Sequence, residues 1–556
     1  MQRSRVALVM ALGALIACTE DGAPAHEQGD AALQADAAVA VDAGAEPPPQ
    51  GLRLELEDGE LEGEQLEGAR RFLNIPYAKP PLGELRWKAP VPNAPWSGVR
   101  RETEFVKSCP QLADQGAPAS DNEDCLYLNV WTPDPAPTGA PVMVWIHGGG
   151  NFSGGAGIPI PTTMKLWYDG QYFASRQGVV LVSVQYRLGP LGFFAHPALA
   201  AEGSPSGNQG LLDQRLALTW VKKNIAKFGG DPGNVTIFGE SAGAADVCYH
   251  VAAPGSRGLF QRAISQSGGC TIRSVGAEQP VAQSAGPLVA YAEAVGCPAG
   301  PDQLACLRQK PIAELLAKAM QPMPGAGEVP ANAWSFAAVI DGSGGFLPDA
   351  PQRLFDRGEI ADVPYLLGAN HDEGTTFVLR AAALTNEAEY RDDLTKRYGR
   401  AAPEVAALYP ASDFGGNYNA ARARVIGDAS IVCGTYDTAL RAAKHGRAVF
   451  LYNFNVAWSI APAALLAGHA AELSHVFGAP HLPNPDAASE QVAQHMNRYW
   501  ARFARTGDPN GPDAPAQWPR FEAGSDLRLQ LAPDWGQLKD FRSRECAFWR
   551  KYHGAL

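Results

Sequence analysis

Several features that mark other classes of protein are missing from this sequence of 556 residues. After residue 18, no apolar run approaches the roughly 20 residues that a membrane-spanning helix needs. No C-x-x-C pair or Cys/His cluster has zinc spacing, so we expect no structural metal. Basic residues are fewer than acidic ones, 46 against 58, and the formal net charge of −12 disfavours nucleic acid as a partner.

The first 18 residues, "MQRSRVALVMALGALIAC", are typical of a secretory signal peptide. Arg3 and Arg5 precede an apolar run, 6–17, that is too short to span a bilayer comfortably. The end of the segment resembles the bacterial lipobox, in which the cysteine, here Cys18, is lipidated. An ordinary signal peptide cleaved nearby is the alternative. We expect an exported lipoprotein that meets the membrane only through this lipid, on the periplasmic or cell-surface side.

Residues 19–50 lack Lys, Arg and aromatic residues and contain seven acids. Such a segment cannot bury enough apolar surface to offset the entropy lost on ordering, so we expect a flexible acidic tether. After residue 51, no repeat and no long linker is apparent. We therefore divide the chain into a signal peptide (1–18), a disordered tether (19–50) and one large globular domain (51–556).

Nine cysteines are present, and Cys18 belongs to the lipobox. The even number that remains is typical of disulfides in an exported chain. Cys109 and Cys125 would close a short loop. Cys297 and Cys306 would close another. Spacing alone does not pair the other four, and free buried thiols are the alternative for some of the eight; the four are Cys248, Cys270, Cys433 and Cys546.

Apolar runs rich in β-formers alternate with segments of helical period along the domain. The expected strands lie in 141–150, 179–187, 234–238, 262–269, 363–374 and 447–456, and the clearest helices in 210–230 and 242–253. Strands this apolar are covered on both faces, and their alternation with helices predicts a large, mostly parallel sheet in an α/β fold. Active sites of such sheets gather at the carboxyl ends of the strands.

The pentapeptide "GESAG" matches G-x-S-x-G, with a predicted strand before it and a predicted helix after it. This setting predicts a sharp turn that lifts the Ser241 hydroxyl clear of the sheet. Gly239 and Gly243 would flank the turn because side chains there would collide with neighbouring backbone. We interpret Ser241 as a nucleophile; a small residue in a glycine turn is the alternative.

An acyl-transfer nucleophile also needs donors for a developing oxyanion. The strand in 141–146 ends in "HGGGN", where bare glycines can present backbone N–H groups. We expect these donors to be Gly149, Gly150 and Ala242, the residue after the nucleophile. A merely flexible glycine loop is the alternative.

The acid and the base of a triad should follow Ser241 in the chain. "LLGANHDEG" offers Asp372 and Glu373, and the pattern does not choose between them. Among the downstream histidines, His469 is favoured because it follows the expected strand in 447–456 by a loop. His475 is its rival.

The motifs together resemble those of the type-B carboxylesterases, the α/β-hydrolase family that includes the cholinesterases, over residues 51–553. The resemblance implies the α/β-hydrolase fold. It is carried by "FLNIPYAKPPLGELRWKAP", "EDCLYLNVWTP", "VWIHGGGNFSGG", "VSVQYRLGPLGFF", "GNQGLLDQRLALTWVKKNIAKFGGDPGNVTIFGESAGA", "QSG", "GANHDEGTTF" and "HAAELSHVFGAP".

This resemblance places the nucleophile on Ser241. It places the acid on Glu373 rather than Asp372, and the base on His469, with His475 where the family usually has an apolar residue. The oxyanion donors and three disulfides also follow from it: Gly149, Gly150 and Ala242, and Cys109–Cys125, Cys297–Cys306 and Cys433–Cys546. Cys248 and Cys270 are not usual family cysteines, and we expect them to form a fourth bridge that stiffens the helix after the nucleophile.

The departures from the family bear on the substrate. The region "LADQGAPASDN" lacks the tryptophan with which cholinesterases bind choline, and Thr376 replaces an aromatic residue three positions after the acid. Without that cation–π cage, we expect no acetylcholinesterase function.

We therefore predict a serine carboxylesterase that works through an acyl-enzyme, without metal or organic cofactor, on small to medium apolar esters. Aromatic residues in 152–175 and 320–346, including Phe152, Trp167, Trp334 and Phe336, indicate an apolar pocket. The alternatives are a lipase, thioesterase or amidase with the same triad, or a binding protein that keeps the fold without catalysis.

Overall fold

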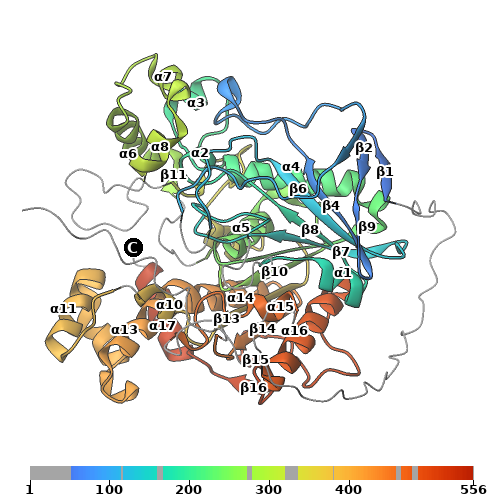
Figure 1. The fold of residues 1–556 in the computed structure, drawn as a ribbon. Coiled ribbons are helices and arrows are strands. Elements are labelled where there is room, and N and C mark those ends of the chain that lie inside the picture. Colours follow the sequence, from blue (N-terminus) through green and yellow to red (C-terminus); the bar gives the residue numbers. More distant parts are fainter. Residues whose placement is uncertain are drawn as a thin grey trace, which may run out of the picture. The chain divides into compact units, whose positions relative to one another are not determined.

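The computed structural model describes residues 52–113, 117–158, 167–271, 279–319, 336–379, 381–458, 465–478 and 486–554. A sheet of eleven strands runs through them, in the order β16-β15-β14-β13-β10-β9-β7-β8-β6-β4-β3 (Figure 1). Its central strands are the apolar runs that the sequence predicts. Two small sheets, β1-β2-β5 and β11-β12, accompany it.

The strands of the described residues are β1 (Arg53–Leu56), β2 (Gly59–Glu62), β3 (Glu64–Leu66), β4 (Ala69–Pro76), β5 (Val99–Arg101), β6 (Tyr127–Pro133), β7 (Ala140–Ile146), β8 (Val180–Val184), β9 (Gly230–Glu240), β10 (Arg262–Gln266), β11 (Gln279–Pro280), β12 (Val339–Ile340), β13 (Tyr365–Asn370), β14 (Val449–Phe454), β15 (Leu527–Leu531) and β16 (Gly536–Lys539).

The α-helices are α1 (Gln171–Gln177), α2 (Gly189–Gly192), α3 (Pro197–Ala201), α4 (Gln209–Asn224), α5 (Ala242–Ala252), α6 (Val281–Ala294), α7 (Gln303–Gln309), α8 (Ile312–Ala319), α9 (Pro351–Arg357), α10 (Gly374–Val378), α11 (Glu387–Tyr398), α12 (Ala402–Leu408), α13 (Tyr418–Gly427), α14 (Cys433–Lys444), α15 (Leu473–Val476), α16 (Ala487–Thr506) and α17 (Ser543–Gly554). A π-helical turn, Asp428–Val432, joins α13 to α14.

The centre of the large sheet is parallel and its two ends are antiparallel. Strands β8, β7, β9, β10, β13, β14 and β15 pair in parallel, in that order across the sheet. Strand β16 at one end, and β6, β4 and β3 at the other, add antiparallel pairs. This arrangement confirms the expected α/β-hydrolase fold, and it brings the carboxyl ends of the parallel strands to one edge.

Helices cover both faces of the sheet, as the strand composition predicts. All seven residues of β7 are buried, and successive side chains enter different cores. Val142, Val144 and Ile146 join the core under α4, α5 and α14. Met143 and Trp145 join the core under α1 and α16. Side chains of a strand alternate between faces, so a strand buried on both sides must be apolar throughout.

Two boundaries near Gly229 differ from the prediction. The helix expected over 210–230 ends at Asn224 and continues as a short 3-10 helix, Ile225–Phe228, before Gly229 adopts a left-handed conformation. Strand β9 begins at Gly230, four residues before the expected start. The sequence there, "GDPGN", reads as a turn, but Ala140 and Gly230 are register partners of β7 and β9, and this pairing extends the strand.

Four disulfides cross-link the domain, and they are the four expected pairs: Cys109–Cys125, Cys248–Cys270, Cys297–Cys306 and Cys433–Cys546. The pair that is unusual for the family, Cys248–Cys270, joins α5 to the residues just after β10. Disulfides are typical of chains that fold in an oxidising compartment, and they indicate that the protein is exported.

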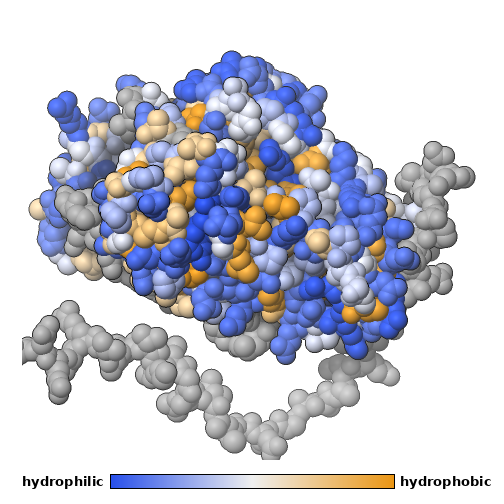
Figure 2. Space-filling model, turned by 90° about the horizontal axis from the view of Figure 1, so that it is seen from above, coloured by the Kyte–Doolittle hydropathy of each residue, from blue (hydrophilic) through white to orange (hydrophobic). Residues whose placement is uncertain are grey.

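The predicted signal peptide, the lipidated Cys18 and the acidic tether lie outside the described residues. None of the helices in the described parts of the chain is long and apolar enough to cross a membrane. The face of the molecule drawn in Figure 2 is mostly hydrophilic, with separate apolar patches between the polar groups.

Candidate active site

Ser241 occupies the turn between β9 and α5, at the carboxyl end of the sheet. Its backbone has φ 56° and ψ −121°, a conformation that a residue with a side chain rarely adopts. A Cβ added at Gly239 would lie 2.6 Å from the carbonyl oxygen of Ile146, and one at Gly243 would collide with the same oxygen. The two glycines thus let the strained turn pack against the end of β7, as the motif predicts.

His469 connects the two other candidate groups. Its Nε2 lies 2.8 Å from Ser241 Oγ, and its Nδ1 lies 2.7 Å from Glu373 Oε2. His469 and Glu373 are buried, whereas Ser241 is half-buried. The serine comes from the turn after β9, the glutamate follows β13, and the histidine follows β14 by a loop. The structure therefore brings the three residues into one continuous chain of hydrogen-bonding distances.

The two rival candidates are placed elsewhere. Asp372 forms an ion pair with Arg424, whose Nη2 donates to Asp372 Oδ1 at 3.0 Å. His475 is buried against Phe454, 5.0 Å between ring centroids, and burial lowers its pKa to about 4. Among the described residues, neither rival contacts Ser241.

The glycine loop after β7 lies beside the nucleophile. A Cβ added at Gly148 would lie 3.1 Å from Ser241 Cβ. Gly149 and Gly150 have positive φ, 102° and 66°, and the Gly149 carbonyl oxygen accepts from the backbone N–H of Ser153. The hydrogen bonds between described residues leave the N–H groups of Gly149, Gly150 and Ala242 unused. Donors held in a fixed loop and not otherwise occupied suit a developing negative charge.

The structure adds two carboxylates that the sequence analysis did not single out. Glu240 Oε1 lies 3.2 Å from His469 Nε2. Glu472 is fully buried and accepts from Asn370 Nδ2 at 2.7 Å and from Gln266 Nε2 at 3.2 Å. Both lie inside motifs already recognised, Glu240 before the serine and Glu472 three residues after the histidine. The signal available in the sequence was a carboxylate inside each of two catalytic motifs.

Asn370 holds the acid and the histidine loop together. Its backbone N–H donates to Glu373 Oε1 at 2.7 Å, and its side chain also donates to the carbonyl oxygen of Gly468 at 2.8 Å. Gly468 directly precedes His469. Asn370 therefore fixes both Glu373 and His469, the two partners of the imidazole–carboxylate contact.

The carboxylates and the histidine shift one another's pKa. Burial raises the pKa of Glu240 to about 8, and the neighbouring carboxylates add to the rise. Burial alone would lower the pKa of His469, but the charges of Glu240 and Glu373 outweigh it and raise the pKa above its ordinary value. Burial also raises the pKa of Glu472. The His469–Glu240 pair therefore holds a proton more tightly than either group would in water.

The aromatic residues that the sequence places in the pocket form two pairs in the structure. Phe152, just after the glycine loop, packs against Phe336 with 6.2 Å between ring centroids. Trp167 packs against Trp458 at 6.1 Å. The fourth expected residue, Trp334, lies outside the described residues. Thr376, where an aromatic residue is usual, directs its hydroxyl to the carbonyl oxygen of His469 at 3.4 Å.

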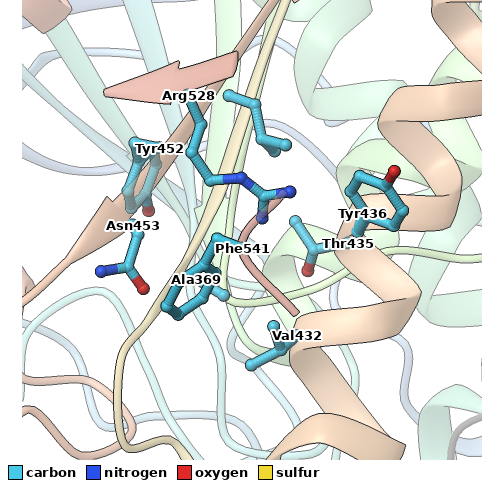
Figure 3. Close-up of a pocket in the computed structure, with 9 residues that line it drawn as sticks. Ala369, Val432, Thr435, Tyr436, Tyr452, Asn453, Arg528 and Phe541 are labelled. Carbon is cyan, nitrogen blue, oxygen red and sulfur yellow. The ribbon is translucent and has the colours of Figure 1, made fainter. Parts of the chain in front are cut away.

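A separate small cavity lies between β13, β14, β15 and α14. The guanidinium of Arg528 reaches into it from β15, facing Thr435 and Tyr436 of α14 (Figure 3). The cavity has room for about one water molecule. A cavity of this size cannot take an ester, so we exclude it as the substrate site.

Comparisons with known proteins agree with this geometry. A model of the Carboxylesterase family matches residues 50–549. An acetylcholinesterase of Bungarus fasciatus is 35% identical over 542 residues, which cover 90% of this chain and 84% of that protein. A cholinesterase of Mus musculus is 35% identical over 517 residues, covering 86% and 83%. The chain therefore belongs to the carboxylesterase family of carboxylic ester hydrolases.

Proposed function

We propose that the protein hydrolyses small to medium apolar esters through a triad of Ser241, His469 and Glu373. The observation that carries this proposal is the pair of contacts at His469, 2.8 Å to Ser241 Oγ and 2.7 Å to Glu373 Oε2. A serine hydroxyl, an imidazole and a carboxylate in this order are the minimum set for an acyl-enzyme mechanism.

In the first step, Ser241 Oγ attacks the ester carbonyl carbon while His469 Nε2 takes the hydroxyl proton. Glu373 accepts a hydrogen bond from Nδ1–H, which fixes the imidazole tautomer and stabilises the imidazolium that forms. The carbonyl oxygen becomes an oxyanion beside the N–H groups of Gly149, Gly150 and Ala242. Loss of one such donor typically lowers the rate by about 10²–10³.

In the second step, the tetrahedral intermediate collapses and His469 gives its proton to the leaving alcohol. Water then attacks the acyl-enzyme, again with His469 as the base, and the carboxylic acid leaves. The chain's own groups supply each proton transfer in this scheme.

Neutral esters are the substrate class that the site supports best. Phe152, which is half-buried and follows the glycine loop, supplies apolar surface there, and the buried Phe336 packs behind it. At position 376 a threonine hydroxyl occupies the place of the aromatic face that would attract a quaternary ammonium. We therefore expect no preference for choline esters.

We further propose that the mature protein begins at a lipidated Cys18 and that residues 19–50 tether the esterase domain to the membrane. The support is the sequence "LIAC" at the end of the apolar run and the composition of the segment that follows. Mass spectrometry of the N-terminal peptide from the membrane fraction tests this part. A diacylglyceryl mass on Cys18 supports it, and an unmodified N-terminus cleaved elsewhere contradicts it.

The catalytic proposal is tested with the purified protein and p-nitrophenyl acetate. We expect Ser241→Ala to lower kcat by at least about 10⁴, because the triad acts as a unit. Ser412→Ala, at an exposed serine of the short helix Ala411–Phe414, is the matched control and should keep full activity. A matched p-nitroanilide separates an esterase from an amidase, and long acyl chains separate it from a lipase. Unchanged turnover by Ser241→Ala would refute the nucleophile.

A further inference from the structure

Leu466, three residues before His469, combines two unfavourable features. Its backbone has φ +48°, in the left-handed region where glycine or asparagine is expected. Its side chain is 47% exposed. A leucine gains most of its stabilising effect from burial, and it is disfavoured by this backbone conformation. In the part of the domain that the structure describes, no packing contact accounts for a leucine at this position.

The loop around Leu466 is held in place by its carbonyl groups. The oxygen of Leu465 accepts from Thr375 Oγ1 at 2.7 Å, and that of Leu466 from the Trp458 N–H at 2.9 Å. The oxygen of Ala467 accepts from the Asp372 N–H at 3.0 Å. These bonds fix the loop that carries His469, and they hold Leu466 in its strained, exposed conformation. Strain maintained in this way concentrates at functional sites.

Two further exposed apolar residues lie on the segment to which this loop is bonded. Phe377, on α10, is 45% exposed, and its ring centroid lies 5.0 Å from that of His469. Leu379, just after α10, is 51% exposed. Among the described residues, seven large apolar side chains are exposed, and three of them are on the two short segments that carry Glu373 and His469. Scattered exposure would not concentrate them there.

We infer that Leu466, Phe377 and Leu379 form an apolar shelf beside His469 that binds the hydrocarbon chain of the alcohol part of the ester. This inference rests on the proposed function and names the substrate class for the same site: esters of apolar alcohols with a chain of several carbons. Leu466 acts here as a specificity-determining residue.

The alcohol side follows from the role of the histidine. His469 Nε2 must reach the leaving oxygen to protonate it, so the alcohol chain leaves the reaction centre past the imidazole. Phe377 packs on that imidazole, and Leu466 belongs to its loop. The glycine loop and Phe152 follow a different strand, β7, and border the carbonyl oxygen of the ester, so they do not belong to this shelf.

The test uses two substrate series with the full-length protein in a pH-stat. One series keeps the acetyl group and lengthens the alcohol from ethyl to octyl acetate. The other keeps the ethyl alcohol and lengthens the acyl group from acetate to octanoate. We expect Leu466→Asn to lower kcat/KM for octyl acetate about 10-fold, through KM, and to change ethyl acetate and ethyl octanoate by less than about 2-fold.

Three comparisons make the result specific. Leu466→Met keeps an apolar side chain and should retain most of the preference for octyl acetate. Leu82→Asn makes the same change at a leucine that is 50% exposed and lies before the short helix Gly83–Leu85, and it should change neither series. The melting temperature of Leu466→Asn should not fall, because asparagine tolerates the left-handed conformation. A loss of octyl acetate activity with an unchanged melting temperature is then a binding effect.

Two results would overturn the inference. One is an unchanged ratio of octyl to ethyl acetate activity in Leu466→Asn. The other is a loss confined to ethyl octanoate, which would place the acyl chain on the shelf. Neither result would affect the proposed triad, which fails only if the wild-type protein does not hydrolyse ethyl acetate or if Ser241→Ala still does.

Discussion

The nucleophile turn and the histidine loop solve the same problem in different ways. Both hold a reacting side chain on strained backbone. In the turn, residues 239–243, glycines occupy the two positions where a Cβ would collide with backbone atoms. Only Ser241 has an unfavourable φ there. In the loop, residues 465–470, Leu466 and Ala470 both have positive φ, 48° and 71°, although glycine would fit there better. The turn is built for close approach, whereas the loop accepts strain in order to present side chains.

The largest effect that sharpens this comparison is expected at Gly243. A Cβ there would collide with the backbone carbonyl oxygen of Ile146, which cannot move without distorting β7. We expect Gly243→Ala to lower the free energy of unfolding by about 3 kcal/mol or more in urea titrations. Gly286→Ala is the control, because a Cβ at this exposed glycine of α6 would meet nothing within 4 Å. Equal stability of the two variants would show that the turn is not sterically constrained.

The next effect concerns the bridge behind the turn. Cys248–Cys270 closes a loop with a sequence separation of 22, which corresponds to about 3 kcal/mol in the chain-entropy description. We expect the double variant Cys248→Ala/Cys270→Ala to lose about that much free energy of unfolding. If the double variant is as stable as the wild type, the Cys248–Cys270 bridge does not stabilise the domain.

The third effect joins the two regions through Glu240 and His469. A negative charge on Glu240 favours the imidazolium, so it raises the pKa of His469, and the base must lose that proton before it can act. Activity should therefore rise with pH through this pKa. In Glu240→Gln the charge is gone, the imidazolium is less stabilised, and the rising limb of kcat/KM against pH should move to lower pH by about one unit. A limb that stays in place or moves to higher pH would contradict the assignment.

The smallest effect is expected in the histidine loop. Ala470 has φ +71°, where glycine is unstrained, so Ala470→Gly should raise the free energy of unfolding by about 0.5 kcal/mol. Ala200→Gly, at an exposed alanine of the helix α3, should lower it by up to about 1 kcal/mol. If both changes destabilise the protein equally, the loop is not strained in the way described.

The same contrast explains what could be predicted from the sequence. The turn could be predicted because Gly239, Ser241 and Gly243 have a fixed spacing between a strand and a helix. The buried strands were readable because they are apolar on both faces. The family match gave the pairing of the distant Cys433 and Cys546, and the structure confirms it.

The conformation of the histidine loop could not be predicted in the same way. Its conformation is fixed by hydrogen bonds from residues far away in the chain, such as Asn370 to Gly468 and Thr375 to Leu465. No local sequence pattern predicts that a leucine or an alanine will have positive φ. Glu240 and Glu472 belong to recognised motifs, but only the folded structure brings Glu240 to 3.2 Å from His469 Nε2. It also places Glu472 near enough for its charge to help raise the pKa of His469.

The central claim is that Ser241 is the nucleophile of an ester hydrolase, and active-site labelling tests it most directly. The protein is treated with a fluorophosphonate, digested, and mapped by mass spectrometry while residual hydrolysis of p-nitrophenyl acetate is followed. We expect one adduct, on Ser241, that appears in proportion to the loss of activity and is absent in Ser241→Ala. Full inactivation with the adduct on another residue, or turnover that survives complete labelling of Ser241, would contradict it.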